Sequence, residues 1–201
     1  MNKQFTSKAL KTKERITLVA EELFTTKGYT ATTLREIVAK ADLTTGAFYK
    51  YYKSKDEILI AIFNEGFIKQ WEYFYDIKED FTPYDYAEMV GKMNKGLAKT
   101  FGFELLKVYC TAQWDMGNQG SLWKVLDSDK YSLYDQSLIE KLTEKYTTQY
   151  KWSEIDDIIL KVDRGVMLDW IIKKGDYDIE EATKNLLLIV FRDIFDKWNW
   201  K

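Results

Sequence analysis

The residues whose types could bind a partner are concentrated at positions 33–55, where hydroxyl, tyrosine and lysine side chains follow one another closely. Hydroxyls and backbone N–H groups at the start of a helix donate to phosphates and to base edges, and lysine neutralises phosphate charge. The segment has the pattern of two short helices joined by a turn at 41–43, which is how small helical domains place one helix in the major groove of DNA. These residues therefore predict binding to double-stranded DNA.

Catalytic chemistry has little support elsewhere in the chain. Histidine is absent and Cys110 is the only cysteine, which excludes Ser-His-Asp and Cys-His catalytic groups and an ordinary structural zinc site. The acidic pair Asp156-Asp157 is followed directly by apolar residues and lacks the spacing of a metal–diphosphate site, so it reads as a solvated helix start. We expect no enzyme activity, no metal and no cofactor; a helical enzyme that uses carboxylates is the remaining alternative.

The cysteine count and the apolar runs bear on the compartment. A single cysteine permits no intrachain disulfide, as is usual in a reducing cytosol. The sequence has no signal-peptide pattern and no long uncharged apolar run. We therefore expect a cytoplasmic protein with no membrane partner, in which Cys110 is a buried and inert side chain; redox sensing is the alternative.

Charge is distributed unevenly along the chain. The net charge is −2, yet residues 1–55 hold 11 Lys and Arg against 5 Asp and Glu, while the remaining residues hold 19 against 27. A basic N-terminal part joined to an acidic remainder predicts that only the N-terminal part meets a polyanion.

The first predicted helix begins between positions 7 and 12 and ends near Lys27, where Gly28 is suited to a C-terminal cap. Apolar residues recur at the i, i+3, i+4, i+7, i+8 spacing of one helix face, at Ile16, Val19, Ala20, Leu23 and Phe24. The segment is therefore an amphipathic helix with a buried side.

Three more helices follow in the N-terminal part. Thr33 and Glu36 have the spacing of a capping box for the second helix. Asp42 lies in the predicted turn, where the chain needs a left-handed backbone that Asp tolerates. The third helix is expected at 44–52. A second capping box at Ser54 begins a long helix that continues to about residue 74.

The helical pattern continues to the C-terminus, with no strand alternation and with only one proline in the chain. Ser153 and Asp178 are the predicted caps of the last two helices. Helices are expected at 83–99, 103–116, 132–150, 153–174 and 178–198, with a short helix and a loop at 121–130. We expect an all-α fold in which a helix-turn-helix domain at 1–54 is joined by a helix to a C-terminal helical domain at 55–201.

Residues 12–60 resemble the DNA-binding domain of the tetracycline-repressor (TetR) family of bacterial transcription regulators. The resemblance is carried by Lys27-Gly28-Tyr29, by the helix start at 32–37 and by the segment Gly46-Ala47-Phe48-Tyr49-Lys50-Tyr51-Tyr52-Lys53-Ser54-Lys55. Asp42 stands where the family commonly has glycine, and Ala47 where it commonly has a hydroxyl residue.

The residue types and the resemblance together select a DNA-binding set. Gly46 permits close backbone approach and Ala47 is small enough to contact a thymine methyl. The resemblance implies phosphate binding by Tyr49 and Lys55, and contact with DNA from Arg35 and Tyr51. Phe48 and Tyr52 are expected in the core. The expected DNA-binding residues are Arg35, Thr44, Thr45, Gly46, Ala47, Tyr49, Lys50, Tyr51 and Lys55.

The resemblance also implies a C-terminal ligand-binding and dimerisation domain whose last two helices pair with those of a second subunit. The long apolar helices at 153–174 and 179–198 are suited to that role, although packing within one subunit is the alternative. The expected dimer-interface residues are Val162, Val166, Leu187, Val190, Phe191 and Ile194.

Aromatic residues are abundant and fall in the regions that would surround a pocket. Two carboxylates adjoin tryptophans, and an aromatic cage with a buried acid is suited to a lipophilic cation; a neutral or acidic hydrophobic ligand is the alternative. The expected ligand-binding residues are Trp71, Phe101, Phe103, Tyr109, Trp114, Asp115, Trp123, Tyr134, Asp169 and Trp170.

The resulting expectation is a homodimeric transcriptional repressor that a small hydrophobic ligand, cationic or not, releases from a near-palindromic operator. The alternative is a ligand-independent DNA-binding protein of the same fold that acts through protein partners.

Overall fold

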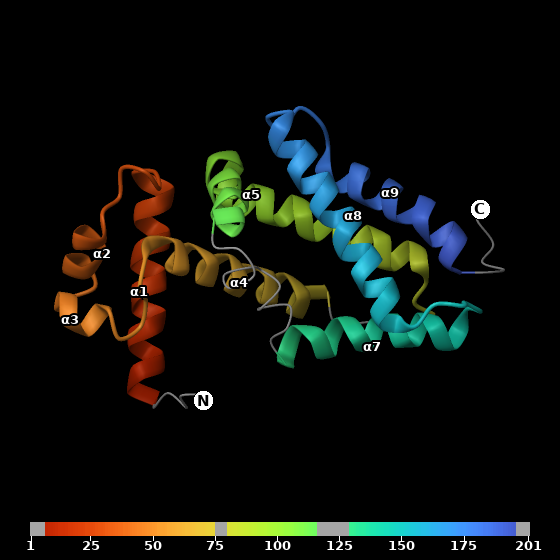
Figure 1. Ribbon diagram of the computed structural model, residues 1–201, viewed down its shortest axis with the longest axis horizontal. Coiled ribbons are helices and arrows are strands. Elements are labelled where there is room, and N and C mark those ends of the chain that lie inside the picture. The colour runs from red at the N-terminus through yellow and green to blue at the C-terminus, as the bar shows by residue number, and fades with distance from the viewer. Residues whose placement is uncertain (1–6, 75–79, 116–128, 196–201) are drawn as a thin grey trace. The chain divides into compact units, whose positions relative to one another are not determined.

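The computed structural model describes residues 7–74, 80–115 and 129–195, and every regular element within them is a helix apart from an isolated bridge residue at 147 (Figure 1). The helices are α1 (Ser7–Thr26), α2 (Leu34–Lys40), α3 (Thr45–Phe48), α4 (Lys55–Phe74), α5 (Pro83–Asp115), α7 (Asp129–Lys145), α8 (Trp152–Ile172) and α9 (Ile179–Ile194). The expected all-α fold is confirmed. In the described residues no helix is long and apolar enough to cross a membrane.

The first three helices pack together, with α2 and α3 beside α1 (Figure 1). The predicted face of α1 buries Ile16, Ala20 and Phe24, and Ile37 of α2 and Phe48 of α3 are buried as well. Each of these side chains is at most 3% exposed. Burying such a side chain contributes about 1.5–3 kcal/mol, so the burial of Phe48 stabilises the packed position of α3.

Capping residues define the ends of these helices as the sequence predicted. Gly28 has φ 92° and Asp42 has φ 51°, the left-handed backbone that the two turns require. Thr33 Oγ1 accepts from the Glu36 N–H at 3.2 Å, and Thr33 N–H donates to the Glu36 carboxylate at 2.8 Å. This reciprocal pair fixes the start of α2.

The third helix is shorter than the predicted 44–52. It spans Thr45–Phe48, and turns follow through Tyr51. The Lys50 N–H donates to the Ala47 carbonyl, and the Tyr51 N–H to the Phe48 carbonyl, both across three residues instead of four. This tighter winding ends the α-helix early, because i to i+3 bonds replace the regular ladder.

The predicted helices at 83–99 and 103–116 form one element, α5, with a break between them. Gly102 has φ 72° and ψ 166°, a conformation that is essentially restricted to glycine. Thr82 caps α5 and exchanges hydrogen bonds with Asp85 at its first turn. The predicted separation is therefore a kink at Gly102 rather than a loop.

The C-terminal helices α7, α8 and α9 pack in sequence order, α7 against α8 and α8 against α9 (Figure 1). Asp178 caps α9 as predicted, through its side chain and the Glu180 N–H. The cap of α8 was predicted wrongly: Lys151 stands there, and the Glu154 carboxylate accepts from its N–H at 2.8 Å. Helix α7 begins at Asp129 and ends at Lys145, not at 132 and 150.

The described residues form two compact units. The first consists of the chain up to Gly66 with α5 from Glu104 onward, and the second of 67–103 with the C-terminal helices. These units differ from the predicted division after residue 54, because α4 and α5 each contribute to both units. The expected short helix and loop at 121–130 fall mostly outside the described residues.

Candidate nucleic-acid interface

Helix α3 and its flanks present polar groups on one side and bury aromatic rings on the other. Phe48 is 0% exposed and Tyr52 4%, whereas Tyr49 is 52% exposed. The Phe48 ring meets the Tyr49 ring edge-on at 5.5 Å and lies 6.4 Å from that of Tyr52. The predicted core role of Phe48 and Tyr52 is confirmed, and their burial holds the opposite face of α3 toward solvent.

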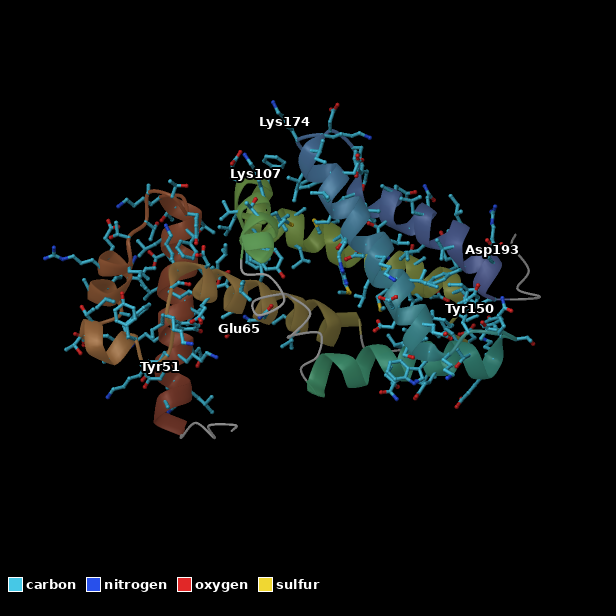
Figure 2. The ribbon with its side chains drawn as sticks, viewed as in Figure 1. Tyr51, Glu65, Lys107, Tyr150, Lys174 and Asp193 are labelled. Carbon is cyan, nitrogen blue, oxygen red and sulfur yellow. The ribbon has the colours of Figure 1, made fainter. Side chains whose placement is uncertain are left out.

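The exposed face contains most of the residues that the sequence selected. Thr44, Thr45, Gly46 and Lys50 are exposed, and a Cβ added at Gly46 would meet no atom within 4 Å. A flat, open backbone with hydroxyls at a helix start fits a base edge or a phosphate. Ala47 and Tyr51 are half-buried, and Tyr51 lies in the turns after α3 (Figure 2).

The two threonines at the start of α3 differ in their bonding. Thr44 Oγ1 accepts from the Ala47 N–H at 3.2 Å and is the N-cap of the helix. Thr45 is the first helical residue and its side chain is exposed. Thr44 therefore stabilises the helix start, whereas the Thr45 side chain is exposed in the first turn.

The basic residues in and near α2 differ in whether an ion pair holds them to their own domain. Lys27 pairs with Glu36, and Lys40 pairs with Glu22 at 2.6 Å, so both lysines face carboxylates of their own domain. The hydrogen bond from Lys27 and the Thr33 cap lower the pKa of Glu36 to about 2, which keeps the capping carboxylate charged. Arg35 is exposed, and the described residues place no ion-pair partner beside it. Among the described residues, Arg35 is therefore an exposed basic side chain of α2, unlike Lys40, which pairs with Glu22.

Lys55 lies in an environment that the sequence did not indicate. Its ammonium donates to the carbonyls of Tyr29 and Thr32 at 2.7 and 2.9 Å. Burial lowers the pKa of Lys55. Two of its three N–H donors therefore bind the loop between α1 and α2, which no spacing rule along the chain predicts.

Lys13 is a second residue whose position the sequence did not indicate. Its ammonium lies 5.5 Å from the centre of the Tyr52 ring, so the N-terminal half of α1 reaches the end of the α3 segment. The basic run at the start of α1 was the available signal. A pairing between positions 13 and 52 follows only from how α1 and α3 pack.

Comparison with known proteins shows which family the N-terminal helices are similar to. Residues 16–62 match the model of bacterial regulatory proteins of the tetR family. Residues 16–62 therefore form a DNA-binding domain of the TetR family. It is 43% identical over 49 residues to the uncharacterized HTH-type transcriptional regulator YerO of Bacillus subtilis, which covers 24% of this chain and 17% of YerO. The chain spans between 17% and 31% of the length of four curated relatives that it matches.

Solved TetR structures extend the similarity to the whole fold. The FadR repressor of Thermus thermophilus, in complex with lauroyl-CoA, has a TM-score of 0.72 at 17% identity and covers 94% of this chain and 98% of its own. RolR in complex with resorcinol has a TM-score of 0.66 at 14% identity, over 90% and 87% of the two chains. The TetR family is one of transcription regulators and not of enzymes.

The aromatic residues expected around a TetR ligand include members of both compact units. Tyr109 is buried and stacks on Phe63, with ring centres 4.0 Å apart. The Phe103 ring lies 5.7 Å from that of Trp170, and Phe101 is 7% exposed. The side chains of the remaining candidates lie outside the described residues; they are Trp71, Trp114, Asp115, Trp123 and Tyr134.

The expected acid beside Trp170 is contradicted. Asp169 is 48% exposed and pairs with Lys173 at 3.0 Å, one turn along α8. The Trp170 indole N–H donates instead to the Tyr177 carbonyl at 3.0 Å. Asp169 is therefore a surface carboxylate, because α8 points it away from the side that buries Trp170.

Most of the expected dimer-interface side chains are buried within the chain itself. Val166 and Ile194 are 3% exposed, and Leu187 and Phe191 are 0%. These four cannot also form the surface of a dimer, and Val162 and Val190 are half-buried. The predicted helices expose other apolar residues: Ile172 at 69%, Leu186 at 45% and Ile189 at 59%. Periodicity identified an apolar face correctly but could not say which neighbour covers it.

Proposed function

We propose that this TetR-family chain is a sequence-specific DNA-binding transcriptional repressor that acts as a homodimer on a near-palindromic operator. The observation that carries the proposal is the two-sided α3 segment, which buries Phe48 and Tyr52 and exposes Thr45, Gly46 and Tyr49. A helix held in this way fits the major groove, with its first residues at the base edges.

The remaining DNA-binding assignments follow from exposure. Arg35, Lys50 and Tyr49 are exposed and are candidates for phosphate or base contacts. Ala47 and Tyr51, both half-buried, are further candidates that would offer apolar and ring surface to DNA. Charged contacts with phosphates release counterions, so operator affinity should fall steeply with salt.

A dimer would present two α3 helices to successive major grooves, about 34–36 Å apart. Exposed apolar side chains on the terminal helices support pairing through α8 and α9, since Leu186 and Ile189 lie one turn apart on α9 and Ile172 lies at the end of α8. In a dimer with twofold symmetry, the same patch on each subunit contacts its counterpart, so an apolar patch can cover itself.

A small hydrophobic ligand is the proposed signal. FadR and RolR are solved with lauroyl-CoA and resorcinol, an acyl thioester and a small phenol, and share the fold of this chain. The aromatic pairs Phe63–Tyr109 and Phe103–Trp170 supply apolar surface in each unit of this chain. Exposure of Asp169 removes one of the two carboxylates that favoured a lipophilic cation. The proposed class therefore includes neutral and acidic hydrophobic molecules.

Selection from a random DNA library with the purified full chain tests the proposal. The expected result is enrichment of an inverted repeat that binds one dimer with an affinity of roughly nanomolar order, and Thr45→Ala should select a different repeat. Lauroyl-CoA, resorcinol and a panel of lipophilic cations are then added to the complex. Release by one class identifies the ligand chemistry, and release by none favours the ligand-independent alternative. Failure to enrich any sequence would contradict the proposal.

A further inference from the structure

Polar groups from three segments converge where the loop between α1 and α2 meets the first turn of α4. Lys55, the first residue of α4, donates to the Tyr29 carbonyl at 2.7 Å and to the Thr32 carbonyl at 2.9 Å. Its ammonium also lies 4.1 Å from the centre of the Tyr29 ring. One cation therefore holds both ends of the segment 29–32.

Tyr29 is held from its other end as well. Its hydroxyl donates to the carboxylate of Asp56, the residue after Lys55, and its ring lies 4.9 Å from that of Phe24. Burial and the neighbouring carboxylate raise the pKa of Tyr29 well above its ordinary value, so the hydroxyl stays a donor at neutral pH. The first turn of α4 thus binds Tyr29 through its ring, its carbonyl and its hydroxyl.

Thr32 connects this cluster to helix α2. It is 1% exposed, and its hydroxyl donates to the Gly28 carbonyl at 2.8 Å. The next residue, Thr33, is the N-cap of α2, and α2 packs against α3. A displacement of the Thr32 carbonyl would therefore move the cap of α2 and, through α2, helix α3.

We propose that Lys55 is a positioning residue for DNA recognition: its ammonium clamps the 29–32 loop to α4, and it acts through these protein carbonyls rather than through a DNA phosphate. The proposal rests on the proposed DNA-binding function. A phosphate ligand would need an accessible ammonium, whereas Lys55 is half-buried and has two of its three donors engaged.

Lys55→Met tests the clamp, because methionine keeps an unbranched side chain and removes the ammonium. Lys53→Met is the matched control, since Lys53 is exposed and lies two residues away, so both variants lose one positive charge from the same segment. The probes are the duplex that the unchanged protein selects from a random library and a random-sequence duplex of equal length.

The expected result for Lys55→Met at 25 °C, with full helicity by circular dichroism, is operator affinity reduced about tenfold or more. Affinity for the random duplex should change little, and the slope of log affinity against log salt should stay that of the unchanged protein. Amide hydrogen exchange should accelerate at 29–37 in Lys55→Met and not in Lys53→Met.

A second variant separates position from charge. Tyr29→Phe removes the hydroxyl that binds Asp56 and alters no charge, so it cannot affect a phosphate contact directly. Operator affinity should fall severalfold with faster exchange at 29–33. This variant also carries the test if Lys55→Met does not fold.

Two results would overturn the proposal. A salt slope that falls by about 0.9 in Lys55→Met, with exchange at 29–37 unchanged, would identify a phosphate contact. Operator affinity equal to that of the unchanged protein, despite faster exchange, would limit Lys55 to structural stability. If the unchanged protein selects no sequence, the proposed function fails instead, and hydrogen exchange alone still tests the clamp.

Discussion

At the residue scale, the adjacent hydroxyls of Thr44 and Thr45 serve different purposes. Thr44 accepts from the Ala47 N–H and caps α3, whereas the exposed Thr45 is the first helical residue. Loss of an N-cap hydroxyl costs about 1 kcal/mol, but an exposed hydroxyl at the first helical position contributes little to stability. Substitutions at the two positions can therefore distinguish an effect on folding from an effect on DNA recognition.

We predict that Thr45→Ala alters base preference without a loss of stability, because the Thr45 side chain is exposed and Thr44, not Thr45, is the N-cap of α3. Selection from a random library should return a changed motif, while the midpoint of thermal unfolding stays within experimental error. Thr44→Ala is the control and should lower the unfolding free energy by about 1 kcal/mol. An unchanged motif for Thr45→Ala would contradict base recognition by this residue.

A polar cluster with Asn94 and Thr183 buried and Asp163 half-buried joins three helices of the second unit. Asn94 of α5 donates from its amide nitrogen to Asp163 of α8 at 2.6 Å and to the Thr183 hydroxyl of α9 at 3.0 Å. Asn94 and Thr183 are 1% and 0% exposed. Burial raises the pKa of Asp163 to about 6, although the Asn94 hydrogen bond and Arg164 oppose the shift.

The raised pKa gives stability a defined pH dependence. Between pH 3.8 and about 6 the unfolded chain releases the Asp163 proton while the folded chain keeps it, so stability falls as pH rises through this window. We predict that Asp163→Asn, which keeps an acceptor for Asn94, raises the unfolding free energy at pH 7 by on the order of 1–3 kcal/mol.

Urea unfolding at pH 4 and pH 7 measures this effect. The unchanged chain and Asp163→Asn differ in one carboxyl, so the difference between their unfolding free energies reports on that carboxyl alone. The two chains should have nearly equal stability at pH 4 and diverge toward pH 7. A variant that is less stable than the unchanged chain at pH 7 would mean that the charge of Asp163 stabilises the fold, with Arg164 as its partner.

At the element scale, α5 and α9 approach so closely that a side chain would not fit between them. A Cβ built at Gly91 would lie 2.5 Å from the backbone carbonyl oxygen of Glu180. One helical turn further, Lys95 pairs with Glu180 at 2.8 Å and with Asp178 at 3.1 Å. Glycine permits the contact, and the ion pairs and the Asn94 cluster fix its register.

We predict that Gly91→Ala destabilises the chain by about 1–3 kcal/mol, because the new methyl group must displace backbone rather than a flexible side chain. Gly165→Ala in α8 is the control, since a Cβ there meets no atom within 4 Å and alanine favours the helix by about 0.5–1 kcal/mol. Urea unfolding measures both. Equal stability of Gly91→Ala and the unchanged chain would show that α9 moves freely on α5.

At the scale of the whole molecule, the proposed dimer rests on apolar side chains that one subunit leaves exposed. We predict that Leu186→Glu with Ile189→Glu converts the dimer to a monomer, because four carboxylates would meet across a twofold axis without partners. Equilibrium sedimentation measures the mass, and operator affinity should fall with it.

The control for this prediction is Leu18→Glu, which changes an apolar α1 residue that is 56% exposed. It should leave the mass of the assembly unchanged. A double variant of α9 that still sediments as a dimer would move the interface to another surface. Leu187→Ala should instead lower stability by about 2–5 kcal/mol, as expected for a side chain that is 0% exposed.

Local signals along the chain predicted the elements well. Apolar periodicity placed α1, α4, α8 and α9, and caps such as Thr33 and Asp178 placed helix starts, because both depend on residues within one or two turns. Errors arose where two local signals competed. Ser153 is a good cap residue, yet Glu154 binds the N–H of Lys151 and the helix begins one residue earlier.

Local periodicity and capping were enough to predict the all-α fold, the helix-turn-helix and the division of α3 into a buried and an exposed face. The neighbour that covers each apolar face and the groups that each ammonium binds are known only from the packed helices. Leu187 and Phe191 became core rather than interface, Asp169 became a surface ion pair, and Lys55 turned toward two backbone carbonyls. The physical reason is that burial and hydrogen-bond partners are set by segments distant in sequence, which no spacing within one helix can specify.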